Sequence, residues 1–297
     1  AVSRRTDRVF RMGALILLSA ALVVRLVGLT TLAGWPNPDE GTYAFFSSEI
    51  ASGAPLRMWY GFYEGPPFYP WLFGAFLKWV KPSLFALWLF PALLSMVTLS
   101  LFALAIRQSG IPRHLGLACL FFLSLTFWPV LGSRLSAAMH TMTILEALGL
   151  WTVALLWNEK NTFRRNLLAM LLGTISGLGF YTYSPWPTLA FLFALLVWRL
   201  PPLAGTVSRW RDRILFLAPF LLFSLPFLKS LGGGDTLTHV HACSTFRFGT
   251  DPLPLLSRMT WVPKYLLTGG EGQPFGYGPV LGGVLNPLLG ALWGVGL

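Results

Sequence analysis

The chain has 297 residues, of which 55% are hydrophobic and only 11% are charged. A soluble domain carries about 25% charged residues, so this composition excludes a water-exposed globule and favours one polytopic membrane bundle. The net charge is +11. In a membrane protein, such an excess indicates arginines that face anionic lipid, and we do not expect a nucleic-acid partner.

The first apolar run, residues 12–32, follows a cluster of arginines at the amino end. Its length of about 21 residues exceeds the roughly 7–15 residues of a signal-peptide core, so it predicts a retained membrane span. Arg25 lies inside this run. A charged residue there faces the bundle interior or reaches the interface. We interpret Arg25 as reaching the interface, with contact to a ligand as the alternative.

The first outer loop is predicted over residues 33–82, which contain no apolar run long enough to cross a bilayer. It opens with the sequence WPNPDEG, whose acids are Asp39 and Glu40. The prolines predict a rigid, extended backbone, and Gly41 predicts a sharp exit from it. Helical spacing of apolar residues then predicts a short amphipathic helix at 41–52, and a second interfacial or re-entrant element is expected at 68–80.

Six further apolar runs predict the remaining complete spans. They are residues 83–106, 115–131, 137–157, 167–183, 187–200 and 214–228. A second long outer loop is expected at 229–285, and an eighth span begins at 286 and is cut short by the end of the sequence. We therefore expect an all-α polytopic membrane protein with one domain over 1–297, seven complete transmembrane helices and a truncated eighth. Further residues of this chain, or a partner protein, would complete the eighth span.

The charges predict an orientation. If the amino end is cytoplasmic, most of the 22 Lys and Arg residues fall in inner segments, and most of the 11 Asp and Glu residues fall in outer ones. This is the distribution that the positive-inside rule requires. We expect a bacterial inner (plasma) membrane protein with a cytoplasmic amino terminus. Its chemistry is expected at the outer face, where the loop after the first span is rich in acids.

Asp39 and Glu40 are the candidates for chemistry. An isolated carboxylate pair in a loop is usually a solvated surface feature, but this pair is rigidified by prolines and abuts the membrane. The same loop returns to the membrane just after Glu64. A carboxylate near a low-dielectric boundary can serve as a general base, and sugar transfer from a lipid phosphate needs a base and a cation for the departing phosphate. Arg134 is the candidate cation, with interfacial anchoring as its alternative.

Five segments occur in a recognisable order. They are Asp39-Glu40, Glu64-Gly65-Pro66-Pro67-Phe68-Tyr69, Ser133-Arg134, Gly177-Leu178-Gly179-Phe180-Tyr181-Thr182-Tyr183 and Asn286-Pro287-Leu288. This series resembles the GT-C membrane glycosyltransferases, in particular the protein O-mannosyltransferases and aminoarabinose transferases often called family 39. The resemblance implies a GT-C-like bundle, a polyprenyl-phosphate sugar donor and inverting transfer at the outer face. It implies Asp39 as the base with Glu40 beside it, and Glu64, Arg134, Tyr181 and Tyr183 as substrate-binding residues.

Two departures from that family pattern favour a second reading. Relatives often carry an arginine shortly after Ser-Arg, where this chain has Ala137 and Ala138, and another after Tyr-Thr-Tyr, where this chain has residues 184–187 without one. Both cations could have served the phosphate. The alternative is therefore a catalytically inactive GT-C-like scaffold subunit of a membrane complex. A transporter is disfavoured, because the acids gather in loops and no repeat is visible.

The expected partners are a polyprenyl-phosphate donor, membrane lipid and, in the scaffold reading, other membrane subunits. No metal-ligand cluster is assigned, although Glu40 or Glu64 could support the acceptor or a divalent cation. Glu146 lies deep in a predicted span. An acid in that position is either functional or hydrogen-bonded to a neighbouring helix.

Overall fold

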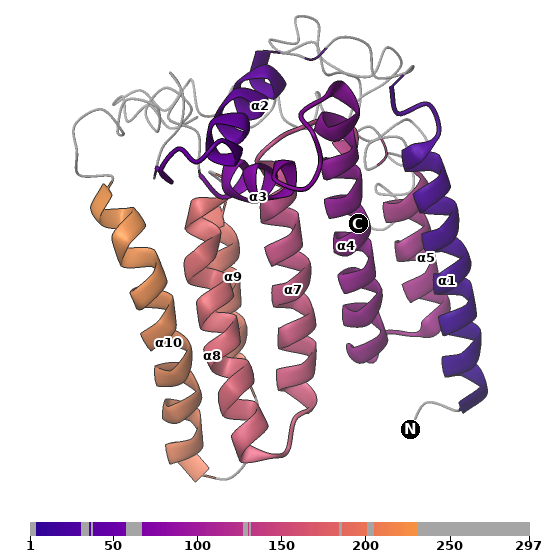
Figure 1. Ribbon diagram of the computed structural model, residues 1–297. Coiled ribbons are helices and arrows are strands. Elements are labelled where there is room, and N and C mark those ends of the chain that lie inside the picture. Colours follow the sequence, from indigo (N-terminus) through magenta and orange to yellow (C-terminus); the bar gives the residue numbers. More distant parts are fainter. Residues whose placement is uncertain are drawn as a thin grey trace, which may run out of the picture. The chain divides into compact units, whose positions relative to one another are not determined.

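The computed structural model describes residues 4–30, 36, 38–57, 67–126, 130, 132–183, 186–200 and 205–230. Within these ranges the chain forms nine α-helices, one short 3-10 turn and no strand (Figure 1). The prediction of an all-α protein is confirmed for this part of the chain. The predictions that concern Glu64, the second outer loop and the eighth span lie outside the described residues.

Each of the seven predicted complete spans, and both short helices expected in the first outer loop, overlaps an observed helix. In chain order the helices are α1 Arg4–Leu26, α2 Pro38–Ala51, α3 Phe68–Leu77, α4 Leu84–Gln108, α5 Arg113–Leu125, α7 Met139–Asn158, α8 Thr162–Leu178, η1 Gly179–Tyr181, α9 Trp186–Arg199 and α10 Gly205–Ser230. Among the described residues, α1, α4 and α7 are long and apolar enough to cross a membrane, whereas α3, α5 and α9 are apolar but shorter. These helices indicate a membrane protein, and the count of seven complete spans stays a prediction.

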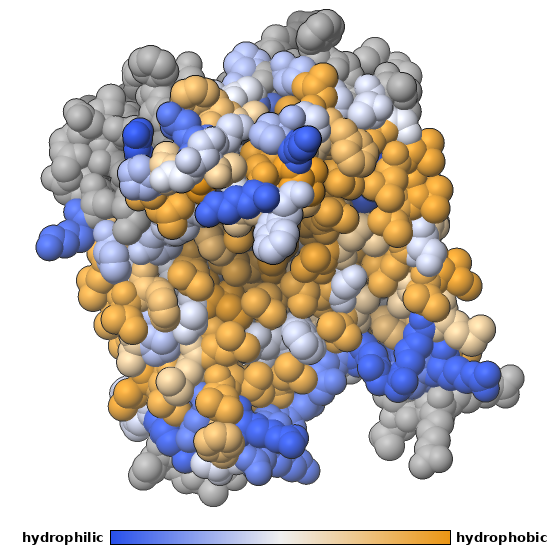
Figure 2. All heavy atoms as spheres, viewed as in Figure 1, coloured by the Kyte–Doolittle hydropathy of each residue, from blue (hydrophilic) through white to orange (hydrophobic). Residues whose placement is uncertain are grey.

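The helices pack as neighbours along the bundle. α8 packs on α10, α4 on α7 and α1 on α5, while α2 and α3 pack on each other. Figure 1 shows α2 and α3 at the end of the bundle opposite the amino terminus, with α3 lying across the ends of the long helices. We call this the α2–α3 end, and the opposite one the N-terminal end. Figure 2 shows apolar residues over the middle of the visible face and hydrophilic residues gathered toward both ends.

The acid pair lies in the first turn of a helix. α2 begins at Pro38, so the backbone at Asp39 and Glu40 is helical, and the predicted extended stretch with an exit at Gly41 is wrong. Proline suits the first turn of a helix because its missing N–H would have no partner there, and acids in that turn are favoured by the helix dipole. The chain leaves the helix later, at Gly53, where φ is +98°.

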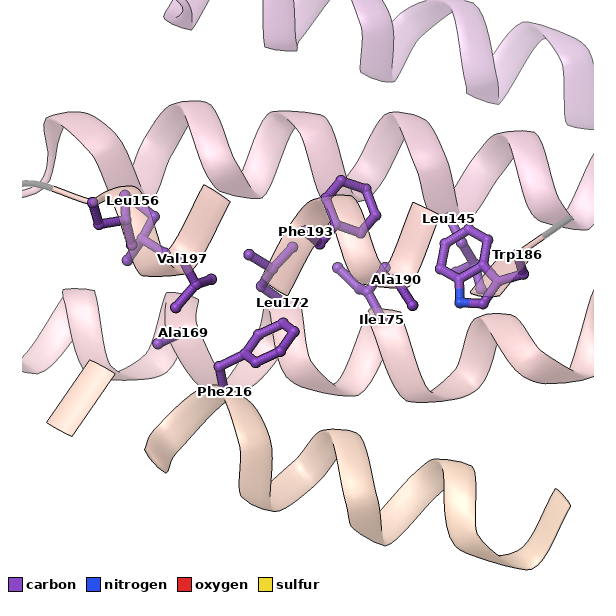
Figure 3. Close-up of a cluster of buried hydrophobic side chains, with 11 residues drawn as sticks. Leu145, Leu156, Ala169, Leu172, Ile175, Trp186, Ala190, Phe193, Val197 and Phe216 are labelled. Atoms are coloured by element: carbon purple, nitrogen blue, oxygen red, sulfur yellow. The ribbon is translucent and has the colours of Figure 1, made fainter. Parts of the chain in front are cut away.

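The largest buried cluster lies between α7, α8, α9 and α10 (Figure 3). Trp186 and Leu172 are fully buried there, and Phe193 and Phe216 are nearly so. The Trp186 indole N–H donates to the carbonyl oxygen of Ser176 at 2.7 Å, so the buried ring leaves no polar atom unpaired. Since lipid supplies no hydrophobic driving force between helices, close packing of this kind holds a membrane bundle together.

Glycines on α8 bring its backbone against α10. A Cβ placed on Gly173 would fall on the carbonyl oxygen of Phe216, and one on Gly177 would lie 2.7 Å from the carbonyl oxygen of Phe220. Nearby, Arg165 on α8 and Asp212 on α10 form an ion pair at 2.8 Å, with both side chains buried. Small residues that permit close backbone approach are typical of membrane helix interfaces.

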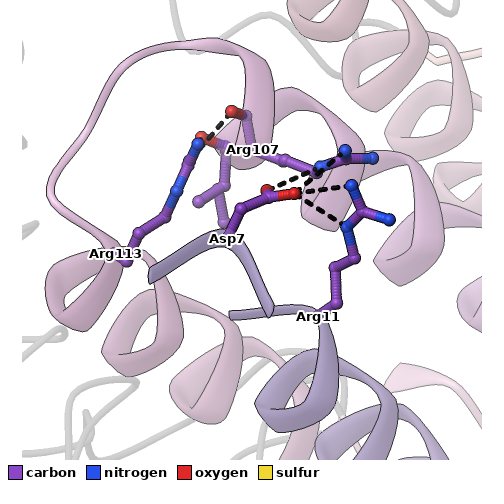
Figure 4. A network of polar contacts seen from close by, with 5 residues as sticks. Asp7, Arg11, Arg107 and Arg113 are labelled. Carbon is purple, nitrogen blue, oxygen red and sulfur yellow. Dashed lines mark hydrogen bonds and ion pairs between the residues drawn. The ribbon is translucent and has the colours of Figure 1, made fainter. Parts of the chain in front are cut away.

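A second charged cluster joins α1 to the α4–α5 turn at the N-terminal end (Figure 4). Asp7 pairs with Arg11 at 2.6 Å and with Arg107 at 3.1 Å. Arg113 donates to the backbone carbonyl oxygen of Arg107 at 2.8 Å. Because Arg11 and Arg107 are exposed, these pairs stabilise the bundle only modestly, and they leave a net positive charge on this end.

We predict that Gly173→Ala lowers the melting temperature of the purified protein, because the added methyl group meets backbone atoms that cannot rotate away. The expected loss is about 1–3 kcal/mol of unfolding free energy, the usual effect of overpacking. Gly41→Ala is the matched control, since Gly41 lies inside α2 with open space around it. That variant should melt at the original temperature or above it. Equal melting of the two variants would contradict the proposed close contact.

Candidate functional site

Glu40 anchors the amino end of α2 to the bundle. Its side chain is only 3% exposed, and Oε1 accepts a hydrogen bond from the backbone N–H of Ser136 at 2.9 Å. The Ser136 hydroxyl in turn shares a 2.7 Å hydrogen bond with the Tyr69 hydroxyl of α3. One buried carboxylate therefore joins α2 to the segment before α7, and the same serine joins that segment to α3.

Tyr69 is the centre of the aromatic packing around this anchor. Its ring lies 5.3 Å from that of Tyr43, 5.4 Å from Phe90 and 6.4 Å from His140, measured between ring centroids. Burial raises the pKa of Tyr69, so its hydroxyl stays neutral at ordinary pH. The His140 ring is held by a 2.7 Å contact between Nε2 and the carbonyl oxygen of Leu135. These contacts fix the positions of the Tyr69 and His140 side chains beneath α2.

Asp39 is the exposed member of the pair. Tyr43 follows it by one helical turn and lies on the same side of α2. Burial, and next the charge of Asp39, raise the pKa of Tyr43 to about 12, and Tyr183 contributes in the same direction. Asp39, Tyr43 and Tyr183 are therefore close enough to interact electrostatically.

The two predicted tyrosines after α8 occupy different environments. Tyr183 is 42% exposed, whereas Tyr181 is 7% exposed. The Tyr181 ring packs against Trp71 of α3 at 6.1 Å and against Phe227 of α10 at 5.3 Å. Burial raises the pKa of Tyr181. Tyr183 is thus accessible beside the acid pair, and Tyr181 joins α3 to the far side of the bundle.

Arg134 is engaged by the end of α1. Its Nη2 donates to the carbonyl oxygens of Val24 at 2.6 Å and Val27 at 2.8 Å. The last carbonyls of a helix lack partners within the helix, so Arg134 caps α1. It makes no ion pair with Asp39 or Glu40. The structure thus places Arg134 with α1 and leaves its Nε without a hydrogen-bond partner.

Arg25 lies beside Arg134 and is only 1% exposed. Its Nε donates to the Ser95 hydroxyl at 2.9 Å, and its Nη1 donates to the carbonyl oxygen of Ser124 at 2.7 Å. The expectation that Arg25 reaches the membrane interface is wrong, because these acceptors on α4 and α5 hold the guanidinium inside the bundle. Its contacts here are structural.

No cluster of three or more His, Cys, Asp or Glu side chains that could hold a metal ion occurs in the part of the chain that the structure describes. Asp39 and Glu40 face different surroundings, one exposed and the other bonded to Ser136. Glu64, the other acid proposed to support the acceptor or a cation, lies outside the described residues.

Sequence reasoning did not assign Ser136, Tyr43 or Trp71 to the site. The spacing of Asp39 and Tyr43 places both on one helical face, so Tyr43 could have been found once the helix was known to begin at Pro38. Trp71 and Ser136 carry no such local signal. Trp71 lies in an apolar helix, and Ser136 contributes its backbone N–H, which any residue but proline could supply.

No family model matches the chain, and no significant match was found among curated proteins or solved structures. The resemblance to GT-C glycosyltransferases therefore stays a hypothesis that rests on the motifs themselves.

We predict that the two acids differ in their effect on stability. Glu40→Ala should lower the unfolding free energy by about 1–3 kcal/mol, because the buried Ser136 N–H loses its acceptor. Asp39→Ala should change it by about 1 kcal/mol or less, the contribution of an exposed acid in a first helical turn. Thermal unfolding in one detergent measures both. The same loss in both variants would show that Glu40 is not the anchor.

Proposed function

We propose that this chain is an inverting membrane glycosyltransferase that moves a sugar from a polyprenyl-phosphate donor to an acceptor at the outer membrane face, with Asp39 as general base. The observation that carries this proposal is that the two acids of the pair lie in different environments. Glu40 is buried and fixes the helix, while Asp39 is exposed on that fixed helix beside Tyr43 and Tyr183.

The proposed reaction uses Asp39 to accept the proton of the acceptor's hydroxyl or amine as that group attacks the anomeric carbon. The bond from the sugar to the phosphate oxygen breaks, and the polyprenyl phosphate leaves with the electron pair. A base must lie within hydrogen-bond reach of the proton it takes, so its position matters as much as its basicity. An anchored helix supplies that position better than a loop would.

Aromatic side chains near Asp39 support a sugar as the transferred group. Tyr183 is accessible, and Trp71 lies half-buried beside Tyr181. A ring face packs well against the C–H face of a pyranose, and phenol hydroxyls provide hydrogen-bond partners for its hydroxyl groups. In this proposal Tyr43 and Tyr183 orient the sugar, while Tyr181 and Trp71 pack against each other behind the site.

The departing phosphate needs a cation, and in the proposal this role does not fall to Arg134 alone. Its Nη2 is held by the carbonyl oxygens of α1. Arg57 is exposed at the same end, and its backbone carbonyl oxygen accepts a 3.1 Å hydrogen bond from the Trp71 indole. We therefore propose Arg57 as the cation on the same side as the aromatic residues.

Asp39→Asn is expected to lower the sugar-transfer rate by about 10²–10⁴-fold, the usual contribution of a general base. The variant keeps the shape of the side chain, so its melting temperature should not fall. Glu49→Gln is the matched control, since Glu49 lies on the same helix near its other end. Transfer is measured with a labelled polyprenyl-phosphate sugar in membranes of a strain that lacks the chromosomal copy. Full activity of Asp39→Asn would remove the base assignment.

The scaffold reading is favoured by one observation, the use of Arg134 as a helix cap. In that reading the bundle has kept the GT-C-like arrangement and packs against other membrane proteins without transferring sugar. The expected result is then stoichiometric copurification of the full chain with unrelated membrane subunits after mild solubilisation. Transfer activity should be undetectable in the original protein and in Asp39→Asn alike.

A further inference from the structure

A groove of about 410 Å³ lies between α7 and α9, within the hydrophobic part of the bundle. Most of its lining is aliphatic or aromatic, including Leu150, Leu192, Phe193 and Leu196. Leu192 is 47% exposed, so this lining continues onto the outer surface of the bundle. Two ionisable side chains, Glu146 and Arg199, complete the lining.

The two ionisable residues lie at different heights along the groove. A Cβ on Gly149 of α7 would meet the ring of Phe193 on α9, which sets these two residues at one level. Glu146 is about one turn from that level toward the α2–α3 end, and Arg199 is nearly two turns away toward the N-terminal end. With a rise of about 1.5 Å per residue, they are separated by roughly 13 Å along the bundle.

Neither residue makes a hydrogen bond or ion pair with another described side chain or backbone group. Arg199 is exposed as the last residue of α9, at the bundle end that carries the surplus of arginines. Glu146 lies inside α7, a helix apolar and long enough to cross a membrane. An unpaired acid at such depth is costly and is a functional candidate by default.

The lining determines what can fill this groove. Between Glu146 and Arg199 the lining is apolar, and an apolar stretch does not hold ordered water because water needs polar partners. The surrounding solvent at this depth is hydrocarbon, so a lipid chain is the available occupant. Arg199 is exposed at the last residue of α9, at the arginine-rich end of the bundle, and its guanidinium suits an anionic phosphate.

We propose that the α7–α9 groove binds one anionic diacyl phospholipid from the leaflet at the N-terminal end of the bundle. Its phosphate contacts Arg199, and one acyl chain follows Leu196, Leu192 and Leu150 toward Glu146. Glu146 closes the groove as the uncharged acid, since a carboxylate beside a hydrocarbon chain would be poorly solvated. This proposal does not rest on the proposed sugar transfer, which belongs to the opposite end of the bundle.

The full chain is tested in vesicles of phosphatidylcholine that contain a small fraction of phosphatidylglycerol with a diazirine near one chain end. After illumination, peptide mass spectrometry should find the adduct on α7 or α9. Arg199→Gln should lower the adduct yield about fivefold, the factor expected for one basic residue at an anionic headgroup. Leu192→Trp, which fills the groove without altering either charge, should lower it as well.

Arg164→Gln is the matched control, because Arg164 is exposed at the same end of the bundle and does not line the groove. Its yield should equal that of the original chain. Equal yields for Arg199→Gln and Arg164→Gln would overturn the proposal, and so would adducts confined to other helices. A phosphatidylcholine probe that carries the same diazirine chain is also used. If it labels the protein as strongly, the proposed selectivity of Arg199 for an anionic headgroup is contradicted. Displacement by polyprenyl phosphate at lower concentration than by phosphatidylglycerol would reject the diacyl occupant.

A second measurement uses the apolar reagent dicyclohexylcarbodiimide. A protonated carboxyl gives its proton to a nitrogen of the reagent while the carboxylate oxygen bonds to the central carbon, and the adduct rearranges to a stable N-acylurea. Glu146 should gain the mass of one reagent molecule in phosphatidylcholine vesicles. Phosphatidylglycerol should slow that labelling, and Arg199→Gln should remove the protection. Absence of labelling at Glu146 would show that the acid does not open to the lipid phase, contrary to the proposal.

Discussion

The arrangement at the α2–α3 end depends on the buried hydrogen bond from the Ser136 N–H to the Glu40 carboxylate. Burying a carboxylate is unfavourable unless it is hydrogen-bonded, so the contact strongly specifies where α2 can lie. Ser136 also bonds Tyr69, and Tyr69 packs against Tyr43. As a result, α2, α3 and the start of α7 hold one another in place. Asp39, the residue before Glu40, is therefore presented on a helix that these contacts anchor.

Buried charge is handled in two different ways elsewhere in the bundle. Arg165 and Asp212 neutralise each other inside the α8–α10 contact. Arg25 has no acid partner among the described residues, and its guanidinium bonds carbonyl oxygens and a hydroxyl instead. Arg134 adds a second positive charge beside it and caps α1. The negative end of the α1 dipole helps both arginines, which explains how two cations can lie together there.

Much of the fold could be predicted from the sequence because apolar runs report helices directly. The helices around Leu99, Leu145 and Leu172 follow from the apolar runs of the sequence alone. The reading failed at Pro38, where two prolines suggested an extended chain although one of them begins a helix. It also failed at Arg25, whose acceptor on α5 lies far away in the chain. The bonds from Arg134 to the end of α1 were not predicted, because their acceptors are equally distant in the sequence. A long-range cap leaves no local pattern, so only the folded arrangement reveals it.

The candidate site was predictable to a similar degree. Adjacent acids at the end of a span marked Asp39 and Glu40 as unusual, but nothing in the sequence indicates which of them is buried. That difference is decided by Ser136, a residue whose side chain carries no catalytic signal. The tyrosines after α8 were found as a motif. The burial of Tyr181 against Phe227 could not be predicted, because Phe227 belongs to α10, which comes much later in the chain.

The long sequence separation within the Glu40 anchor also has a consequence for biosynthesis. Glu40 and Ser136 are 96 residues apart, and Tyr69 and Ser136 are 67 residues apart. Ribosomes add about 5–20 residues per second, so α2 is made roughly 5–20 s before its partner exists. During that interval α3, α4 and α5 are also made, so α2 can already contact α3, but the N–H that binds Glu40 does not yet exist. The acid pair therefore acquires its two separate environments late, when the start of α7 has entered the bilayer.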